Sequence, residues 1–121
     1  MGRVVHFELN VPNPQRAAEF YRRVFGWTIE KWQGPLDYWL VMTGDEAEPG
    51  IDGGIGPTDG AAASNIVIGV ASVDEVTEEV LAAGGTVVVP KMAVPGVGWT
   101  AYYQDPEGIV LGVMESDPSA K

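Results

Sequence analysis

The same order of predicted elements occurs twice along this 121-residue chain, and the repeat constrains the fold more than any other feature. Each half reads as a strand, a helix and then three strands. Laying one half over the other places Val11 on Val70 and Gly26 on Gly85. A βαβββ unit cannot easily bury both its helix and its sheet face alone. Two such units can form one curved sheet with the helices outside, so the sequence predicts an α+β protein.

The predicted domain covers residues 1–121 and contains both modules. Module one spans about 3–57, module two spans 65–115, and a Gly-, Ala- and Ser-rich linker occupies 58–64. The polar segment 116–121 is expected to be frayed. The two modules are expected to form a curved mixed sheet with a concave cleft, which would hold a small molecule.

Local signals predict where several elements begin and end. Asn13 followed by Pro14 is an N-cap and first-turn pair, which predicts a helix over about 14–25. In the second half, Ser72 and Glu75 form a capping box at the start of another helix. A β-branched strand beginning at Thr86 is expected to end at Pro90.

The first strand, over 4–11, is half apolar and half polar. Its apolar face carries Val5, Phe7, Leu9 and Val11. The other face carries His6, Glu8 and Asn10, and His6 is the only histidine in the chain. That face is either solvated or lines a polar cleft. His6 and Glu8 are the pair that we expect to carry any proton chemistry.

The composition excludes several classes of partner. Seven basic residues against 17 acidic ones give a net charge of −10, which disfavours nucleic acid and anionic membrane surfaces. No stretch is apolar enough for a membrane span, and no secretory leader is visible. The absence of cysteine removes disulfides and thiolate chemistry. A cytoplasmic protein is therefore expected.

Three stretches resemble the vicinal oxygen chelate superfamily, which includes glyoxalase I, extradiol dioxygenases and bleomycin-resistance proteins. They are Val-His-Phe-Glu at 5–8, the helix and following Gly-Trp over 17–27, and Asp-Pro-Glu-Gly at 105–108. The resemblance covers 3–115 and is greatest to small glyoxalase-like proteins. It implies the paired βαβββ fold and, together with exposed aromatic strands, a homodimer.

The resemblance also implies where a metal would bind. In metal-dependent members the ligands come from the first and last strands of each module, and the matched positions here are His6, Asn65 and Glu115. The fourth position falls at 54–56, which offers mainly glycine. A divalent metal (zinc, nickel, manganese or iron) would have an incomplete shell, for which Glu8 could substitute. Alternatively, His6 is a cleft histidine hydrogen-bonded to Glu8 or Glu115.

Two functions follow from the resemblance, and the sequence leaves both open. One is a glyoxalase-like lyase or isomerase that uses His6, Glu8 and Glu115, with or without a metal. The other is a non-catalytic protein of the bleomycin-resistance kind, which binds a small molecule or antibiotic. Trp39 and Trp99 occupy similar places in the two modules and are the expected stacking surfaces, with Asn65 beside them.

Overall fold

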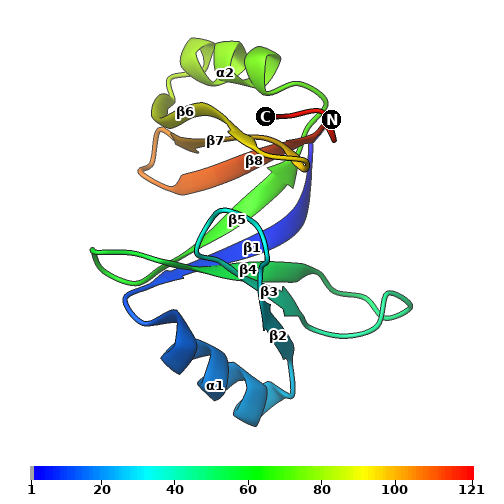
Figure 1. The fold of residues 1–121 in the computed structure, drawn as a ribbon. Coiled ribbons are helices and arrows are strands. Elements are labelled where there is room, and N and C mark those ends of the chain that lie inside the picture. The colour runs from blue at the N-terminus through cyan, green and yellow to red at the C-terminus, as the bar shows by residue number, and fades with distance from the viewer. Residues whose placement is uncertain (1) are drawn as a thin grey trace. The chain divides into compact units, whose positions relative to one another are not determined.

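The computed structural model describes residues 2–121, and the chain forms two compact units. The first unit is His6–Asn65. The second is Ile66–Lys121 together with the N-terminal residues up to Val5. Each unit has one helix packed on a four-stranded arrangement, as the ribbon shows (Figure 1).

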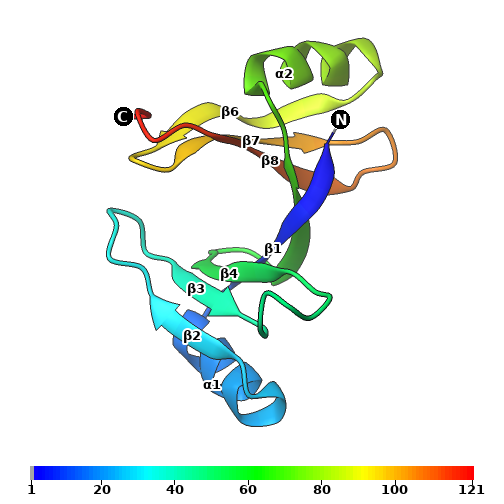
Figure 2. The same ribbon diagram turned by 90° about the vertical axis from the view of Figure 1, so that its right-hand side faces the viewer.

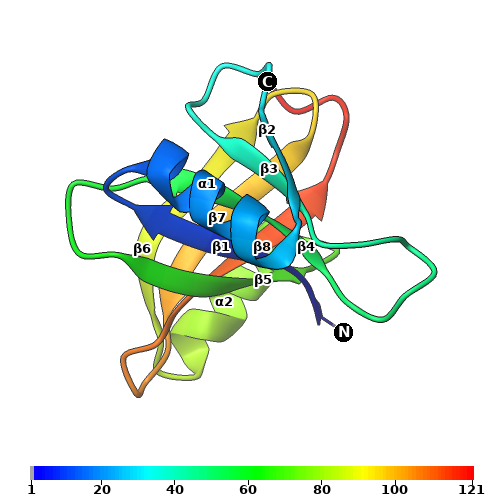
Figure 3. The same ribbon diagram turned by 90° about the horizontal axis from the view of Figure 1, so that it is seen from below.

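The first unit follows the order strand, helix and three strands. Its elements are β1 (Arg3–Val11), α1 (Pro14–Phe25), β2 (Thr28–Lys31), β3 (Trp39–Met42) and β4 (Asp52–Pro57). The strands lie in the order β2-β3-β4-β1, in which β1 and β4 are parallel and the other pairs are antiparallel. The view in Figure 3 looks onto α1, which lies across these strands.

The pairing of β1 with β4 sorts the side chains of the first unit into two faces. One face packs under α1 and forms the core with Ala18, Ile29, Trp39, Val41 and Ile55. The register places the polar residues of β1 on the opposite face, with His6 beside Asp52, Glu8 beside Gly54 and Asn10 beside Gly56. The alternation predicted for the first strand therefore holds in the structure.

The second unit repeats the same order. Its elements are β5 (Ala63–Gly69), α2 (Val73–Ala82), β6 (Thr86–Val94), β7 (Gly98–Gln104) and β8 (Val110–Ser116). The strands lie in the order β5-β8-β7-β6, with β5 and β8 parallel. Figure 2 shows β6, β7 and β8 side by side beneath α2. Its core consists of Val73, Ala101, Tyr103 and Val113 beneath α2.

The predicted α+β class and the repeated βαβββ order are confirmed, and the helix caps form as expected. The Asn13 side chain accepts a hydrogen bond from Arg16 N at 3.1 Å, and Gly26 ends α1 in the left-handed conformation with φ of 70°. The Ser72 side chain accepts from Glu75 N at 3.2 Å. The grouping of both units into one domain, and the concave cleft, stay predictions.

Two boundaries differ from expectation. The expected linker over 58–64 is shorter, because β5 already begins at Ala63. The strand expected to stop at Pro90 continues to Val94 through a shift of register. Because β6 is the outermost strand in its order, Pro90 can lie in it without removing a ladder hydrogen bond.

The C-terminal segment 116–121, expected to be frayed, is instead tied to the second unit. Ala120 is only 4% exposed, and its carbonyl accepts a hydrogen bond from Gly96 N at 2.9 Å. Asp117 accepts from Trp99 Nε1 at 3.0 Å. The polar composition of this segment was the reason to expect fraying. One of its polar residues, Asp117, nevertheless provides the carboxylate that binds the segment to Trp99. No helix within residues 2–121 is long and apolar enough to cross a membrane.

Candidate functional site

A hydrogen-bonded group of polar side chains lies on the polar face of β1 in the first unit. The Tyr38 hydroxyl donates to Glu8 Oε2 at 3.5 Å, and His6 Nε2 lies 3.3 Å from the same hydroxyl. Asn10 Nδ2 donates to Glu8 Oε1 at 3.3 Å. All four side chains are half-buried. Since the phenol directs its proton to the carboxylate, the contact from His6 is satisfied by an Nε2–H donor.

Two glycines of β4 make room for Tyr38 on this face. A Cβ built at Gly54 would lie 1.8 Å from the Tyr38 hydroxyl oxygen, and one at Gly56 would lie 3.4 Å from the Tyr38 ring. Both glycines are buried. The ring therefore covers the part of β4 that pairs with Glu8 and Asn10. This is how a residue just before β3 reaches the polar groups of β1.

The environment of His6 favours its neutral form. Burial lowers the pKa of His6 below its usual 6.5, and the nearby charges of Glu8 and Asp52 oppose this effect only in part. Asp52 itself is tied to the end of β3, where its carboxylate accepts a hydrogen bond from Thr43 N at 2.9 Å. A neutral imidazole, a phenol and a carboxylate together form a group that can accept, hold and return a proton.

Glu115, expected to join His6, has a different role in the structure. Its Oε1 accepts a hydrogen bond from Val73 N, the first residue of α2, at 2.8 Å. Glu115 also alternates with Val113 and Leu111, which pack under α2, so it lies on the helix side of β8. The side chain stabilises the N-terminus of α2 as a capping carboxylate. We correct our expectation that it points to the polar face.

Of the two tryptophans expected to be stacking surfaces for a ligand, Trp39 is part of a core and Trp99 is half-buried against one. Trp39 is 9% exposed and packs with Ile29 and Ile55. Trp99 packs against the core beneath α2, and Lys91 Nζ lies 4.7 Å from its ring centroid. The third expected ligand contact, Asn65, is half-buried near the start of β5, at the last residue of the first unit. Among the predicted site residues, His6 and Glu8 are joined by hydrogen bonds through the Tyr38 hydroxyl.

The side chain that the sequence did not single out is Tyr38. Alternation alone allows an aromatic side chain to lie on either face of a strand, and the sequence favoured the neighbouring Trp39 as a ligand contact. The useful signal lay in β4, where Gly54 and Gly56 leave the polar face without side chains of its own. A strand face of that kind needs cover, and the tyrosine preceding the neighbouring strand provides it.

The resemblance implies a divalent metal whose ligands come from the first and last strands of each module. In module one, Tyr38 covers Gly54, the position expected to supply a last-strand ligand. In module two, Val67 takes the place of Glu8 in the repeat and pairs with Gly112, over which the Tyr102 ring lies. Glu115 is bonded to α2. Within residues 2–121, no three His, Asp or Glu side chains are grouped to hold a metal ion. The residues present do not fit such a site.

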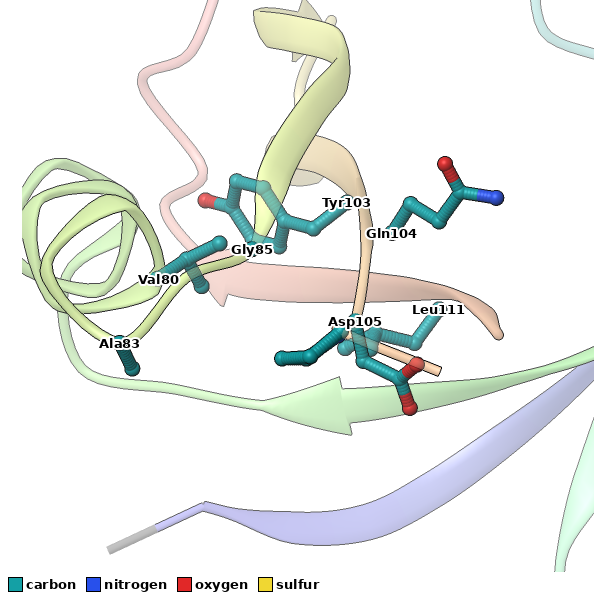
Figure 4. Close-up of a pocket in the computed structure, with 8 residues that line it drawn as sticks. Val80, Ala83, Gly85, Tyr103, Gln104, Asp105 and Leu111 are labelled. Carbon is teal, nitrogen blue, oxygen red and sulfur yellow. The ribbon is translucent and has the colours of Figure 1, made fainter. Parts of the chain in front are cut away.

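A separate pocket of about 190 Å³ lies within the second unit, between the end of α2 and the turn from β7 to β8 (Figure 4). Its polar side chains have structural partners: the Tyr103 hydroxyl is bonded to Thr77 Oγ1 at 2.6 Å, and Asp105 accepts from Glu107 N and Ile109 N. The lining residues are Val80, Ala83, Gly85, Tyr103, Gln104, Asp105, Pro106 and Leu111. Gln104 Nε2 donates to the Gly108 carbonyl at 3.2 Å, so the polar side chains of this pocket take part in local hydrogen bonds.

Solved structures define the class of fold. A methylmalonyl-CoA epimerase from Mycobacterium tuberculosis superposes with a TM-score of 0.67 at 14% identity, over 94% of this chain and 87% of that one. A variant of the Streptomyces coelicolor epimerase gives 0.67 at 17% identity, over 98% and 97%. The Mn(II)-bound glyoxalase from Novosphingobium aromaticivorans gives 0.66 at 19% identity, over 98% of this chain but 38% of that one. These likenesses define a two-module α+β fold.

The sequence gives the more specific assignment. Residues 3–113 match the model of the Glyoxalase/Bleomycin resistance protein/Dioxygenase superfamily, so the chain belongs to that superfamily. No curated protein matches the chain significantly. The resemblance noted from the sequence is thereby confirmed.

Proposed function

We propose that this protein binds a small molecule with an acidic C–H bond next to a carbonyl group and moves that proton, as isomerases and lyases do. The observation that carries the proposal is the hydrogen-bonded group of Glu8, Tyr38 and His6 on one strand face. The ligand would lie against the polar face of β1 and β4 in the first unit. The sequence left open a lyase or isomerase and a non-catalytic binding protein. The lyase or isomerase function does not require Trp39 or Trp99 to stack on the ligand.

Glu8 is the base in this reaction. Its carboxylate takes the proton from carbon, and the electron pair of the broken C–H bond moves to the carbonyl oxygen to give an enolate. The Tyr38 hydroxyl then turns from Glu8 to donate to the enolate oxygen, which stabilises the charge where it develops. Return of the proton to carbon from Glu8 regenerates the carboxylate. To give the epimer, a proton from solvent water must reach the opposite face of the carbon, and Glu8 then releases its own proton to solvent.

His6 is the third member of the group and acts through Tyr38. Its neutral imidazole donates from Nε2 to the phenol oxygen and so orients the phenol proton. The lowered pKa of His6 keeps this hydrogen-bonding pattern intact at neutral pH. A protonated His6 would also draw charge from Glu8 and weaken it as a base.

The activities named for proteins of similar fold support this class of reaction. An epimerase inverts a carbon centre, and the similar structures from Mycobacterium tuberculosis and Streptomyces coelicolor are methylmalonyl-CoA epimerases. A glyoxalase in the same set is bound to Mn(II). Since Tyr38 covers Gly54 and Glu115 caps α2, we propose that this chain performs proton transfer without a resident divalent metal.

Deuterium exchange tests the proposal. The protein would be incubated in D₂O with EDTA and a panel of carbonyl compounds that carry an acidic C–H bond, with methylmalonyl-CoA included as the probe suggested by the epimerases. We expect deuterium incorporation with wild type, a loss of about 100-fold in Glu8→Gln, and a similar loss in Tyr38→Phe. Glu48→Gln, which alters an exposed loop carboxylate, is the matched control and should leave the rate unchanged.

Two results would overturn the proposal. One is exchange no faster than background across the whole panel. The other is exchange that EDTA abolishes and added zinc, nickel, manganese or iron restores, which would return the metal to the site. A ligand that binds equally well to wild type and Glu8→Gln without exchange would instead establish the non-catalytic binding function.

A further inference from the structure

We propose that the first unit selects an uncharged carbonyl compound whose apolar substituent lies on Leu40 and Met42. This inference rests on the proposed function, because it names the class of substrate that Glu8 would deprotonate. It is carried by the register of β2, β3 and β4, which determines the side chains that share a sheet face with Glu8.

Two apolar side chains of β3 share the sheet face of Glu8. The register pairs Glu8 with Gly54 and Gly54 with Leu40, so Leu40 follows Glu8 across the sheet on the same face. Met42, two residues along β3, lies on this face as well. Leu40 is 39% exposed and Met42 is 37% exposed, whereas the alternate residues of β3 are buried beneath α1. This apolar surface lies two strands from Glu8, roughly 10 Å away at the usual strand spacing, which a substituent of several carbon atoms can span.

Among residues 6–65, which the structure describes in full, no lysine or arginine lies on this face. The basic residues of the first unit are Arg16, Arg22, Arg23 and Lys31. The three arginines are in α1, which packs on the opposite face of the sheet. Lys31 Nζ lies 5.3 Å from the ring centroid of Trp39, a core residue, so this lysine is also on the helix side. A carboxylate or phosphate of a ligand would therefore find no cationic side chain on this face of the first unit.

The charges that do lie on this face are negative. Glu30 pairs with Leu40 across β2 and β3, shares its face and is exposed. Asp52 pairs with His6 across β1 and β4, and its charge acts on His6. Together with Glu8, these carboxylates give the face a single sign of charge, which repels an anionic ligand and admits an uncharged one.

The proposed proton transfer itself disfavours an anionic substrate. When Glu8 takes a proton from an uncharged substrate, the carboxylate becomes neutral as the enolate becomes negative, so the net charge on the face stays constant. A substrate with its own carboxylate would add a further negative charge beside Glu30 and Asp52 in every state. It would bind more weakly, and its enolate would be less stabilised. Methylmalonyl-CoA, which carries a carboxylate and phosphates, is therefore expected to be a poor substrate for this chain.

A matched pair of substrates tests the charge selection. One is the N-acetylcysteamine thioester of methylmalonic acid, whose free carboxylate is negative, and the other is the methyl ester of the same thioester, which is uncharged. Deuterium exchange at the shared C–H bond is measured with EDTA, and each rate is divided by the uncatalysed rate in the same buffer. We expect the acceleration by wild type to be at least about tenfold greater for the ester.

A charge reversal on the face should reduce this preference. Glu30→Lys should lower the ester-to-acid ratio by about threefold or more at low salt, and by less as salt increases. Glu19→Lys is the matched control, because it makes the same charge change on α1, which packs on the other face. The control should leave the ratio unchanged.

Chain length tests the apolar surface. Replacing the α-methyl group of the ester by hexyl should raise kcat/KM, relative to the uncatalysed rate, by about tenfold or more, since each buried CH₂ group adds to binding. Leu40→Ala and Met42→Ala should each lower the hexyl-to-methyl ratio by about threefold, and Leu40→Met should keep it. A variant that only disturbed the fold would slow both compounds and leave their ratio unchanged.

The outcomes separate the substrate class from the proposed reaction. If wild type exchanges the acid as well as the ester, or hexyl no better than methyl, the substrate class is wrong, while loss of exchange in Glu8→Gln would still support the reaction. If no compound exchanges above background, the reaction fails, and the imidazole resonance of His6 in NMR spectra still reports binding. A shift caused by the hexyl ester and not by the acid would support the charge selection, and an equal or larger shift with the acid would overturn it.

Discussion

At the residue scale, the site depends on two glycines as much as on its polar groups. Gly54 and Gly56 leave the polar face of β4 open, and the Tyr38 ring lies in the space that their missing side chains provide. Tyr38 in turn brings Glu8 and His6 into one hydrogen-bonded group. A methyl group added to one of these glycines should therefore displace Tyr38 and disturb its hydrogen bonds, while it changes the free energy of unfolding only slightly.

Gly54→Ala tests this dependence. The added Cβ would lie 1.8 Å from the Tyr38 hydroxyl, so the flexible tyrosine must move away and release His6. We expect the free energy of unfolding to change by no more than about 1 kcal/mol, because alanine fits a strand better than glycine and offsets part of the disruption. The signal is the single imidazole resonance of His6 in NMR spectra, which should shift as it does in Tyr38→Phe.

Gly44→Ala is the matched control for this change. A Cβ there would approach only Glu48 Oε1, at 4.0 Å, and should leave the His6 resonance where it is. An unchanged His6 resonance in Gly54→Ala would contradict the role that we assign to the glycine.

At the element scale, the sequence predicted most of what is local. Asn13 and Ser72 cap the helices through their own backbone neighbours, and this information lies within four residues. The identity of the polar strand face, with His6 and Glu8, followed from alternation alone. Glu115 was misjudged because its partner, Val73 N, is 42 residues away and belongs to a helix end rather than to a strand. The place of Tyr38 likewise depended on which strand lay beside which.

The role of Glu115 in α2 gives a prediction for the stability of this element. Glu115→Ala removes a carboxylate from the first backbone N–H of the helix, where a negative charge is favourable. We expect a loss of about 1–2 kcal/mol in the free energy of unfolding measured in urea. Glu115→Gln keeps an acceptor oxygen and should lose less. Glu107→Ala, in an exposed turn, is the control and should be nearly neutral; equal effects of the two alanine variants would contradict the capping role.

At the scale of the whole molecule, one half-buried histidine links the proposed site to the stability of the fold. The unfolded chain protonates His6 near its usual pKa of 6.5, whereas burial lowers the pKa of the folded form. Between these two values the unfolded state binds more protons than the folded state. Stability must therefore fall as pH decreases through 6.5, and the loss is complete once pH lies below the folded pKa. Above 6.5 both states are neutral at His6 and the effect disappears.

His6→Gln removes this term and keeps a side chain that can hydrogen-bond to Tyr38. We expect the difference in unfolding free energy between wild type and His6→Gln to be constant above neutral pH and to shift in favour of the variant as pH falls below 6.5. Urea titrations of both chains at a series of pH values measure it directly. The acid-range contribution of Asp117, whose pKa is lowered by hydrogen bonds from Ser119 and Trp99, is common to both chains and cancels. If the difference stays constant across the whole pH range, His6 has the same pKa in the folded and unfolded states. If the difference moves in favour of wild type in acid, Glu8 and Asp52 raise the folded pKa of His6 more than burial lowers it.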